Sequence, residues 1–299
     1  MGPKANGPLP GEPGKLRPVK SAALLILVLM LSGSALGQPA GTLERIKANG
    51  RITLGYGVDA RPFSFEDSGG KPIGYGVEVC ARVAGALKAQ PRFVQVKRAE
   101  GLRAVAEGRI DVLCDAFIPT PASRREVSFS IPVFATGIGA VVRNDRFERL
   151  TDLVSGRAPR TSQPYTFALI AGSRAEPLAI ERLRALKIDV KTVAVKDYHA
   201  GIDAVTVQRA DAFFADRAAL LDTVRRGPRA KELRILERYF THDALAFALA
   251  RGDEDFRLAV DDALSRLLRA EEIRTLYTKW FGEPSEETLS LFRLGALRE

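Results

Sequence analysis

The sequence predicts an α/β protein with two similar lobes, and three observations support this. The chain of 299 residues is long for one compact core and comfortable for two. Strand-like apolar runs alternate with segments of helical periodicity, the pattern of parallel sheets covered on both faces. A helix, a short turn and a strand bearing an aspartate occur twice, near 107–112 and near 208–212.

Each predicted element follows from local composition or from the spacing of apolar residues. Runs rich in β-branched, aromatic and small apolar residues predict strands at Ile52–Tyr56, Phe93–Val96, Ile110–Cys114, Ile138–Val142, Val190–Val195, Ala210–Phe214, Leu233–Leu236 and Leu245–Ala250. Apolar residues recurring every three or four positions predict helices at Gly76–Lys88, Glu100–Ala106, Glu176–Leu186, Ala200–Val207, Arg217–Val224, Asp255–Leu268 and Glu271–Trp280.

Residues 1–37 are predicted to be a secretory signal peptide outside the fold. A basic, Gly- and Pro-rich start precedes the apolar run Ala22–Leu31, and Ala35-Leu36-Gly37 supplies a small-x-small exit. The run is shorter than the roughly 20 residues that cross a bilayer, although an uncleaved anchor is the alternative. Cleavage after Gly37 leaves a mature, exported chain that is expected to be soluble and periplasmic.

The net charge does not indicate a nucleic-acid partner. The whole chain carries 45 basic and 36 acidic residues, and removal of the leader leaves 41 and 35. The 33 arginines and 12 lysines are scattered, and they form no basic stripe interleaved with aromatic residues. Two cysteines and two histidines exclude a disulfide-dense scaffold and favour neither a zinc module nor a histidine-rich metal site, so no metal or cofactor is expected.

The two cysteines are predicted to form a disulfide after export. Cys80 lies on the apolar face of the predicted helix Gly76–Lys88, and Cys114 ends a buried strand. A helix packed on that strand would bring the sulfurs together in an oxidising compartment. Two separate buried thiols are the alternative.

The repeated unit also indicates where a ligand would bind. Polar residues follow the strands that end at Cys114 and Phe214. Ligands of open α/β sheets bind outside the carboxyl ends of the strands, so these two segments are the first place to look for a site.

Several short motifs together resemble those of a known family. The sequence is similar to the extracellular solute-binding proteins of ABC transporters, in the group that binds polar amino acids. The similar segments occur in the family's order and cover nearly all of residues 43–282: Leu54-Gly55, Pro62-Phe63-Ser64-Phe65, Gly74–Val79, Gly108–Val112, Thr120–Pro132, Gly172-Ser173, Ala210–Asp216 and Trp280-Phe281-Gly282.

The resemblance implies a two-lobed periplasmic-binding-protein fold with two crossing hinge strands and a ligand cleft between the lobes. Lobe one would comprise 43–137 plus 244–299, and lobe two would comprise 138–243. The protein would deliver a small polar solute, an amino acid or related amine-bearing compound, to the membrane permease of an ABC importer. A monomer without catalytic activity is expected.

The resemblance also implies which side chains hold the ligand's charges. A zwitterion in a water-excluding cleft needs one fixed cation and one fixed anion, because an unpaired buried charge is costly. The family's Thr-x-x-Arg pattern falls on a stretch one residue longer here, which makes Arg124 the first candidate for the carboxylate, Arg125 the second and Thr120 a helper. Asp216 would accept the ammonium group.

Other candidates have structural alternatives. Ser173 would start a lobe-two helix whose N–H groups meet the carboxylate, or act only as an N-cap. Asp216 is also a suitable N-cap for the helix that begins at Arg217. Phe63, a possible cleft residue, also suits the core, whereas the two arginines could be a solvated surface pair.

Two departures from the family pattern point to a changed ligand pocket. Asp115 stands where small hydroxyl or glycine residues are usual, and it would favour a cationic group on the ligand unless Arg61 or Arg174 offsets it. Ala60 replaces a frequent aromatic partner. An altered, non-amino-acid ligand is therefore one alternative function.

The other alternative is an enzyme on the same fold, of the dehydratase or cell-wall lyase type. Asp115, Glu66, His199 and His242 are the candidate acids and bases. No Ser-His-Asp arrangement, HExxH motif or phosphate-cradling loop is present in the sequence.

Overall fold

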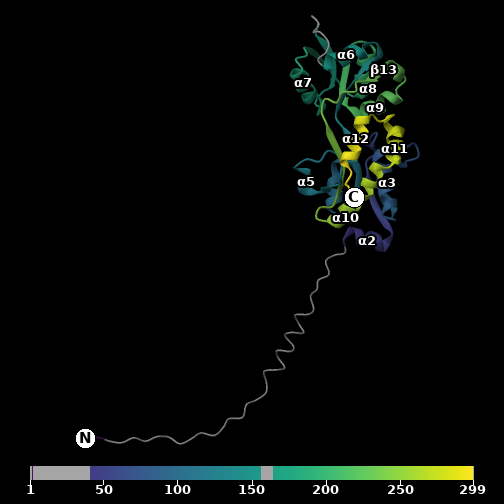
Figure 1. Cartoon of the computed structure of the whole chain (residues 1–299), viewed down its shortest axis with the longest axis vertical. Helices are drawn as coiled ribbons and strands as arrows, with labels where there is room; N and C mark the ends of the chain where they lie inside the picture. Colours follow the sequence, from purple (N-terminus) through teal and green to yellow (C-terminus); the bar gives the residue numbers. More distant parts are fainter. Residues whose placement is uncertain (1, 3–40, 156–163, 299) are drawn as a thin grey trace. The chain divides into compact units, whose positions relative to one another are not determined.

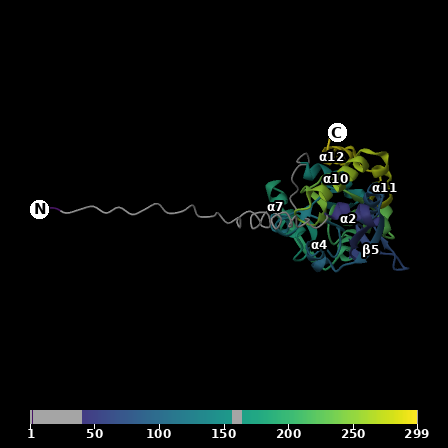
Figure 2. The same cartoon turned by 90° about the horizontal axis from the view of Figure 1, so that it is seen from below.

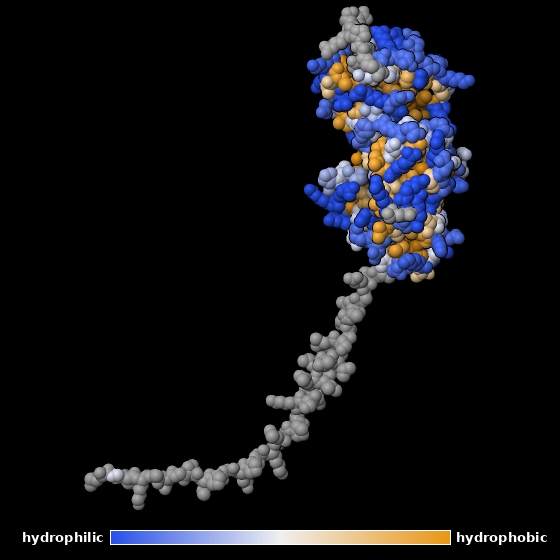
Figure 3. Space-filling model, viewed as in Figure 1, coloured by the Kyte–Doolittle hydropathy of each residue, from blue (hydrophilic) through white to orange (hydrophobic). Residues whose placement is uncertain are grey.

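The computed structural model describes residues 2, 41–155 and 164–298 (Figure 1). The predicted signal peptide, residues 1–37, lies outside the described residues apart from Gly2. Within the described ranges, no helix combines the length and the apolar character needed to cross a membrane. Hydrophilic residues cover most of the face of the folded part that Figure 3 shows, with hydrophobic residues exposed between them.

The first large sheet is built from two distant parts of the chain. Its strand order is β5-β1-β6-β14-β7, with β8 beside β14. The parallel strands β1, β5 and β6 form one part of it, and β14 runs antiparallel to β6, β7 and β8. The bounds are β1 Arg51–Tyr56, β5 Gln90–Gln95, β6 Val112–Phe117, β7 Ser128–Phe129, β8 Phe134–Thr136 and β14 Asp243–Leu249.

Both faces of this first sheet are covered, because residues along each strand alternate between two hydrophobic clusters. In β14, Phe247 joins the larger cluster and its neighbour Ala248 joins the smaller one. The larger cluster receives side chains from α2 Thr42–Asn49, α3 Tyr75–Ala86, α10 Glu254–Arg269, α11 Glu271–Phe281 and α12 Glu286–Gly295. The smaller one receives α4 Gly101–Ala106, and Figure 2 shows α4 apart from the gathered α10, α11 and α12.

The second large sheet is formed by one continuous part of the chain, residues 138–235. Its order is β11-β10-β12-β9-β13, with β10 parallel to β11 and β12, and β9 antiparallel to β12 and β13. Its strands are β9 Ile138–Arg143, β10 Tyr165–Ile170, β11 Val190–Val195, β12 Ala212–Asp216 and β13 Leu233–Ile235. Its faces pack against α6 Phe147–Val154 and α7 Ala175–Ala185, and against α8 Tyr198–Thr206 and α9 Arg217–Arg226.

The remaining elements are short. A three-stranded sheet has the order β2-β3-β4. These strands and the short helices are β2 Asp59–Ala60, β3 Ser64–Glu66, β4 Pro72–Ile73, η1 Arg98–Glu100, α5 Ser123–Glu126, η2 Asn144–Arg146 and η3 Ala230–Glu232. The expected α/β class is confirmed, although α2, α6, α12 and the internal strand β10 were not predicted from the sequence.

The weak sequence repeat corresponds to a repeated contact. The carboxylate of Asp111 accepts a hydrogen bond of 2.7 Å from the Thr53 N–H, on the strand before it in the sheet. The carboxylate of Asp211 accepts one of 2.9 Å from the Thr166 N–H in the second sheet. Each aspartate therefore fixes the start of its strand against the neighbouring strand, in both halves of the protein.

Two chain segments pass between the sheets side by side. Gly137 links β8 to β9, and a Cβ atom at this position would lie 1.8 Å from the Thr241 carbonyl oxygen, so only glycine allows so close an approach. The Ile138 N–H donates to the Thr241 hydroxyl at 3.0 Å. β14 then begins at Asp243, which pairs with Thr136.

The predicted disulfide is present in the structure. Cys80 on α3 and Cys114 on β6 are bonded, with their Cα atoms 6.0 Å apart, and both residues are buried. The bond closes a separation of 34 residues and ties α3 to the first sheet.

We expect the Cys80→Ala/Cys114→Ala double variant to unfold with a free energy lower by about 2–4 kcal/mol, because the open chain gains entropy when unfolded. Urea unfolding measures the difference. Reductant should destabilise the wild type and leave the double variant unchanged; equal stability of the two oxidised proteins would contradict the prediction.

Candidate functional site

A cavity of about 520 Å³ lies where the two large sheets present the carboxyl ends of their strands. It lies in the region that the sequence indicated for a ligand site: Ala116 and Ile118 line it from the end of β6, and Ala215 and Asp216 line it from the end of β12. The remaining lining residues are Asp59, Ala60, Arg61, Phe63, Arg98, Ile138, Ile170, Ser173, Arg174, Ala175, Tyr198, Ala219 and Leu245.

Asp216 is the main anion on the second-sheet side of the cavity. Its carboxylate caps α9, accepting the N–H groups of Ala218 at 3.0 Å and Ala219 at 3.2 Å. The Thr136 hydroxyl donates to it at 3.3 Å from the segment that leads out of the first sheet. Burial raises the pKa of Asp216 above its usual value, while these donors and the Arg174 guanidinium oppose that rise. The predicted N-cap is confirmed, and it coexists with a position on the cavity wall.

Tyr198 and Ser173 add polar atoms beside Asp216. Burial, together with the nearby Asp216 charge, raises the pKa of Tyr198 to about 12, so the phenol stays protonated. The Ser173 hydroxyl is buried and has no hydrogen-bond partner among the described residues. The alternative interpretation of Ser173 as an N-cap is wrong, because Arg174 occupies the N-cap position of α7. Tyr198 begins α8 and was missed, since nothing in its local sequence distinguishes it from a core residue.

Arg98 is a cation on the first-sheet side of the cavity, and it forms an ion pair with a buried carboxylate. Its guanidinium lies 3.6 Å from the carboxylate of Asp115, which is 1% exposed, and 4.8 Å from the centroid of the Phe117 ring. Burial raises the pKa of Asp115, whereas bonds from Ser64 and Gly57 and the charge of Arg98 lower it. A Cβ atom at residue 57 would lie 2.7 Å from that carboxylate, so glycine is needed there.

Two further arginines line the cavity, and each has its own aspartate. Arg174 donates two hydrogen bonds to Asp243, at 2.7 and 3.2 Å. Arg61 stacks on the Phe65 ring, 3.5 Å from its centroid, and its Nε lies 3.5 Å from Asp222 of α9. Arg61 therefore connects the first-sheet side of the cavity to α9 on the second-sheet side.

The structure does not bring Thr120, Arg124 or Arg125 to this cavity. The hydroxyls of Thr120 and Ser123 bond each other and each other's N–H groups, so the segment folds into the one-turn helix α5. Arg124 is exposed, and its guanidinium lies 5.6 Å from the centroid of the Phe129 ring. None of the three residues that the family pattern selected lines the cavity, whereas Arg98, outside that pattern, does.

Phe63 and Asp115 combine structural and site positions. Phe63 lines the cavity and also packs edge-on against Phe134, with 5.1 Å between ring centroids. The sequence predicted that Asp115 is an anion at the cleft mouth. This prediction is wrong, because Asp115 is buried behind Arg98. Ala60 lines the cavity and offers no aromatic surface.

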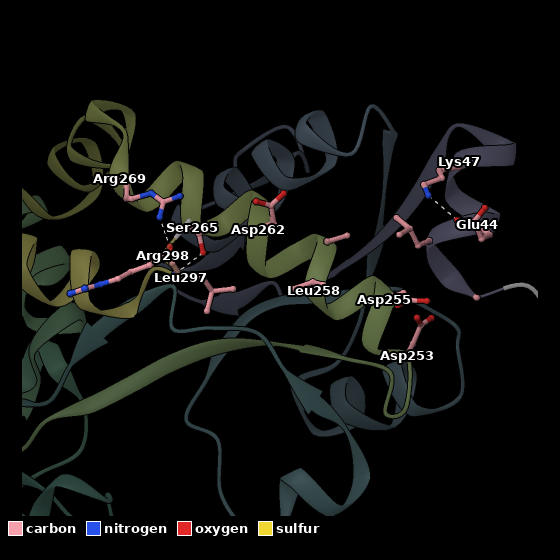
Figure 4. A pocket seen from close by; sticks show the side chains of 13 residues that line it. Glu44, Lys47, Asp253, Asp255, Leu258, Asp262, Ser265, Arg269, Leu297 and Arg298 are labelled. Carbon is pink, nitrogen blue, oxygen red and sulfur yellow. Dashed lines mark hydrogen bonds and ion pairs between the residues drawn. The ribbon is translucent and has the colours of Figure 1, made fainter.

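A second hollow of about 670 Å³ lies away from these residues, among α2, α10 and the C-terminal segment (Figure 4). It contains none of the predicted site residues. Its acidic side chains do not form a metal site, and within residues 41–155 and 164–298 no cluster of His, Cys, Asp and Glu could hold a metal ion.

Comparison with known proteins identifies the family. Residues 52–283 match the model of bacterial extracellular solute-binding proteins, family 3, so the chain belongs to that family. It is 23% identical to the L-glutamate/L-aspartate-binding protein of Pseudomonas aeruginosa, over 90% of this chain and 89% of that one. It is 26% identical to the L-cystine-binding protein TcyJ of Escherichia coli, over 81% and 86%.

A solved structure supports the fold. The chain is similar to a polar amino acid ABC uptake transporter substrate-binding protein from Streptococcus thermophilus, with a TM-score of 0.73 at 14% identity, covering 87% of this chain and 97% of that one. The two-lobed fold predicted for this chain is thereby confirmed.

The raised pKa of Asp216 predicts a pH-dependent stability. A carboxyl whose folded pKa lies above its unfolded value binds protons more readily in the native state, so stability falls as pH rises through that interval. We expect Asp216→Asn, which keeps a capping oxygen, to reduce this fall and to be no less stable than the wild type at pH 7. Asp216→Ala should cost about 1 kcal/mol through loss of the cap. Urea unfolding between pH 3.5 and 7 measures both, and a large loss in Asp216→Asn would contradict this account.

Proposed function

We propose that this protein binds a small α-amino acid in the 520 Å³ cavity and delivers it to an ABC importer. One observation carries the proposal: a cation and an anion from opposite sides, Arg98 and Asp216, line the same cavity. A zwitterion placed between them would satisfy both charges at once. The names of the relatives, which bind glutamate, aspartate or cystine, support an amino acid as the ligand class.

Arg98 is the best-placed group for the ligand's carboxylate. Among the described residues its guanidinium makes no hydrogen bond, and its Asp115 contact of 3.6 Å orients it without occupying its donors. Arg174, by contrast, already donates two bonds to Asp243. A planar guanidinium with unused N–H groups can donate two parallel bonds to a carboxylate.

Asp216 and Ser173 would complete the polar contacts. Asp216 is fixed by its capping bonds, so its carboxylate needs no reordering to accept an ammonium group. The unpartnered Ser173 hydroxyl would donate to the ligand's carboxylate, whereas the sequence had indicated the backbone N–H groups of this segment for that role. The aliphatic remainder of the lining, including Ile118 and Ile170, would exclude water on closure and strengthen these interactions.

Closure would couple ligand occupancy to shape. We keep the division into lobe one, 43–137 plus 244–299, and lobe two, 138–243, as part of the proposal, because the chain passes between the sheets beside Gly137 and Asp243. A ligand that bridges the lobes stabilises the closed form only when both charges are met. A membrane permease would read that form in the periplasm, after removal of residues 1–37, and a monomer suffices for this role.

We infer a binding protein rather than an enzyme. Three of the four acid–base candidates already have a partner: Asp115 faces Arg98, Glu66 accepts the Tyr56 hydroxyl at 2.9 Å, and His242 stacks on Tyr239. The fourth, His199, does not line the ligand cavity. Asp216 accepts three donors, two of them backbone N–H groups, which suits a fixed charge better than a proton carrier. Stoichiometric binding without turnover of arogenate or peptidoglycan fragments supports this inference, whereas turnover would overturn it.

We expect a thermal-shift screen of the twenty amino acids to raise the melting temperature for at least one of them, because a ligand that binds only the native state stabilises it. For that ligand, Arg98→Gln should weaken binding by about 100-fold, as expected when one partner of a desolvated charge pair is lost. Calorimetric titration measures the affinity.

Arg124→Gln is the matched control, since it removes the same charge outside the cavity and should leave the affinity unchanged. The reverse pattern, with Arg124→Gln abolishing binding and Arg98→Gln silent, would return the carboxylate to the position the sequence first indicated. A screen in which no amino acid stabilises the protein would refute the proposed ligand class.

A further inference from the structure

A second, smaller chamber adjoins the ligand cavity. It has a volume of about 370 Å³, and four residues, Asp59, Arg61, Tyr198 and Ala219, line both spaces. We propose that this side chamber receives a second cationic group at the far end of the ligand's side chain, an amine or a guanidinium, and that Asp59 binds it. The inference rests on the proposed function and narrows its ligand class.

The side chamber carries an excess of negative charge. Four carboxylates line it, Asp59, Glu66, Asp197 and Asp222, against two guanidiniums and one histidine. The cationic and histidine residues are Arg61, Arg226 and His199. A cationic group entering this chamber is therefore attracted, whereas a carboxylate is repelled.

Three of these carboxylates already have partners. Glu66 accepts the Tyr56 hydroxyl, and Asp197 caps α8 by accepting the Ala200 N–H at 2.8 Å. Asp222 accepts hydrogen bonds of 2.8–3.0 Å from Arg226. These bonds fix the chamber's wall and leave little capacity for a ligand.

Asp59 differs from the other three. Its side chain has no hydrogen bond or ion pair with any described residue, and it lies in β2, which pairs with β3. It also borders both spaces, and it is the only carboxylate among the four described residues that do so. Asp59 therefore places an anion without a described partner where the two spaces meet, and its neighbour in the chain, Ala60, has only a methyl side chain.

The test compares two ligands that differ only at the far end. L-lysine and L-norleucine share the α-amino acid group and the four-carbon chain, and only lysine carries the terminal amine. We expect calorimetric titration to show lysine binding about tenfold more tightly than norleucine, the size of a partly exposed charge-assisted contact. Asp59→Asn should remove that preference and leave norleucine's affinity unchanged.

Asp255→Asn is the matched control variant. Asp255 is an exposed aspartate that lines the separate hollow beside α10 (Figure 4), so its substitution removes the same charge without touching either chamber. The lysine preference should survive in this variant. Since Asp59 and Asp255 are both exposed, both variants should keep the ligand-free melting temperature of the wild type.

The outcomes separate this inference from the proposed function. Equal binding of lysine and norleucine, or a lysine preference that survives Asp59→Asn, overturns the side-chamber subsite and leaves amino-acid binding intact. Loss of the preference in Asp255→Asn as well as in Asp59→Asn reduces the effect to overall charge and also overturns the subsite. Binding of neither these two ligands nor any other amino acid overturns the proposed function and the subsite with it.

Discussion

The carboxylate of Asp216 joins three parts of this protein at one point. It ends β12, caps α9 through two backbone N–H groups, and accepts the hydroxyl of Thr136 from the segment that leaves the first sheet. Burial makes its charge costly, as the direction of its pKa shift shows. A positively charged group placed beside this carboxylate would offset that cost, and the proposed ligand carries such a group in its ammonium.

The arginines around the cavity follow the same principle. Asp115, Asp222 and Asp243 each hold one of the three guanidiniums that line it. A cation backed by an aspartate is fixed in place before the ligand arrives, which lowers the ordering cost of binding. The ion pair between Arg61 and Asp222 also spans the cleft, because Asp222 lies on the opposite side from Arg61. This pair therefore favours approach of the two lobes.

Most of the fold could be predicted from the sequence, and part of the site could not. Strand and helix periodicity identified most elements, and the repeated aspartate marked equivalent strand starts at Asp111 and Asp211. The internal strand β10 and the last helix were missed although each carries a local signal: β10 is an apolar and aromatic run, and the Ser285 hydroxyl caps α12. Asp216 was identified from its predicted strand end and from the family pattern, and Ser173 from the family pattern alone. Arg98 was not identified, because a short helix folds it toward Asp115 from a segment without a recognisable motif.

The most direct test of the account is a crystal structure of the protein with the amino acid that stabilises it best in solution. We expect the ligand's carboxylate within hydrogen-bond distance of the Arg98 guanidinium and its ammonium group within hydrogen-bond distance of Asp216, in a closed cleft. A carboxylate bound by Arg124, or a ligand that leaves Arg98 and Asp216 without contact, would contradict it.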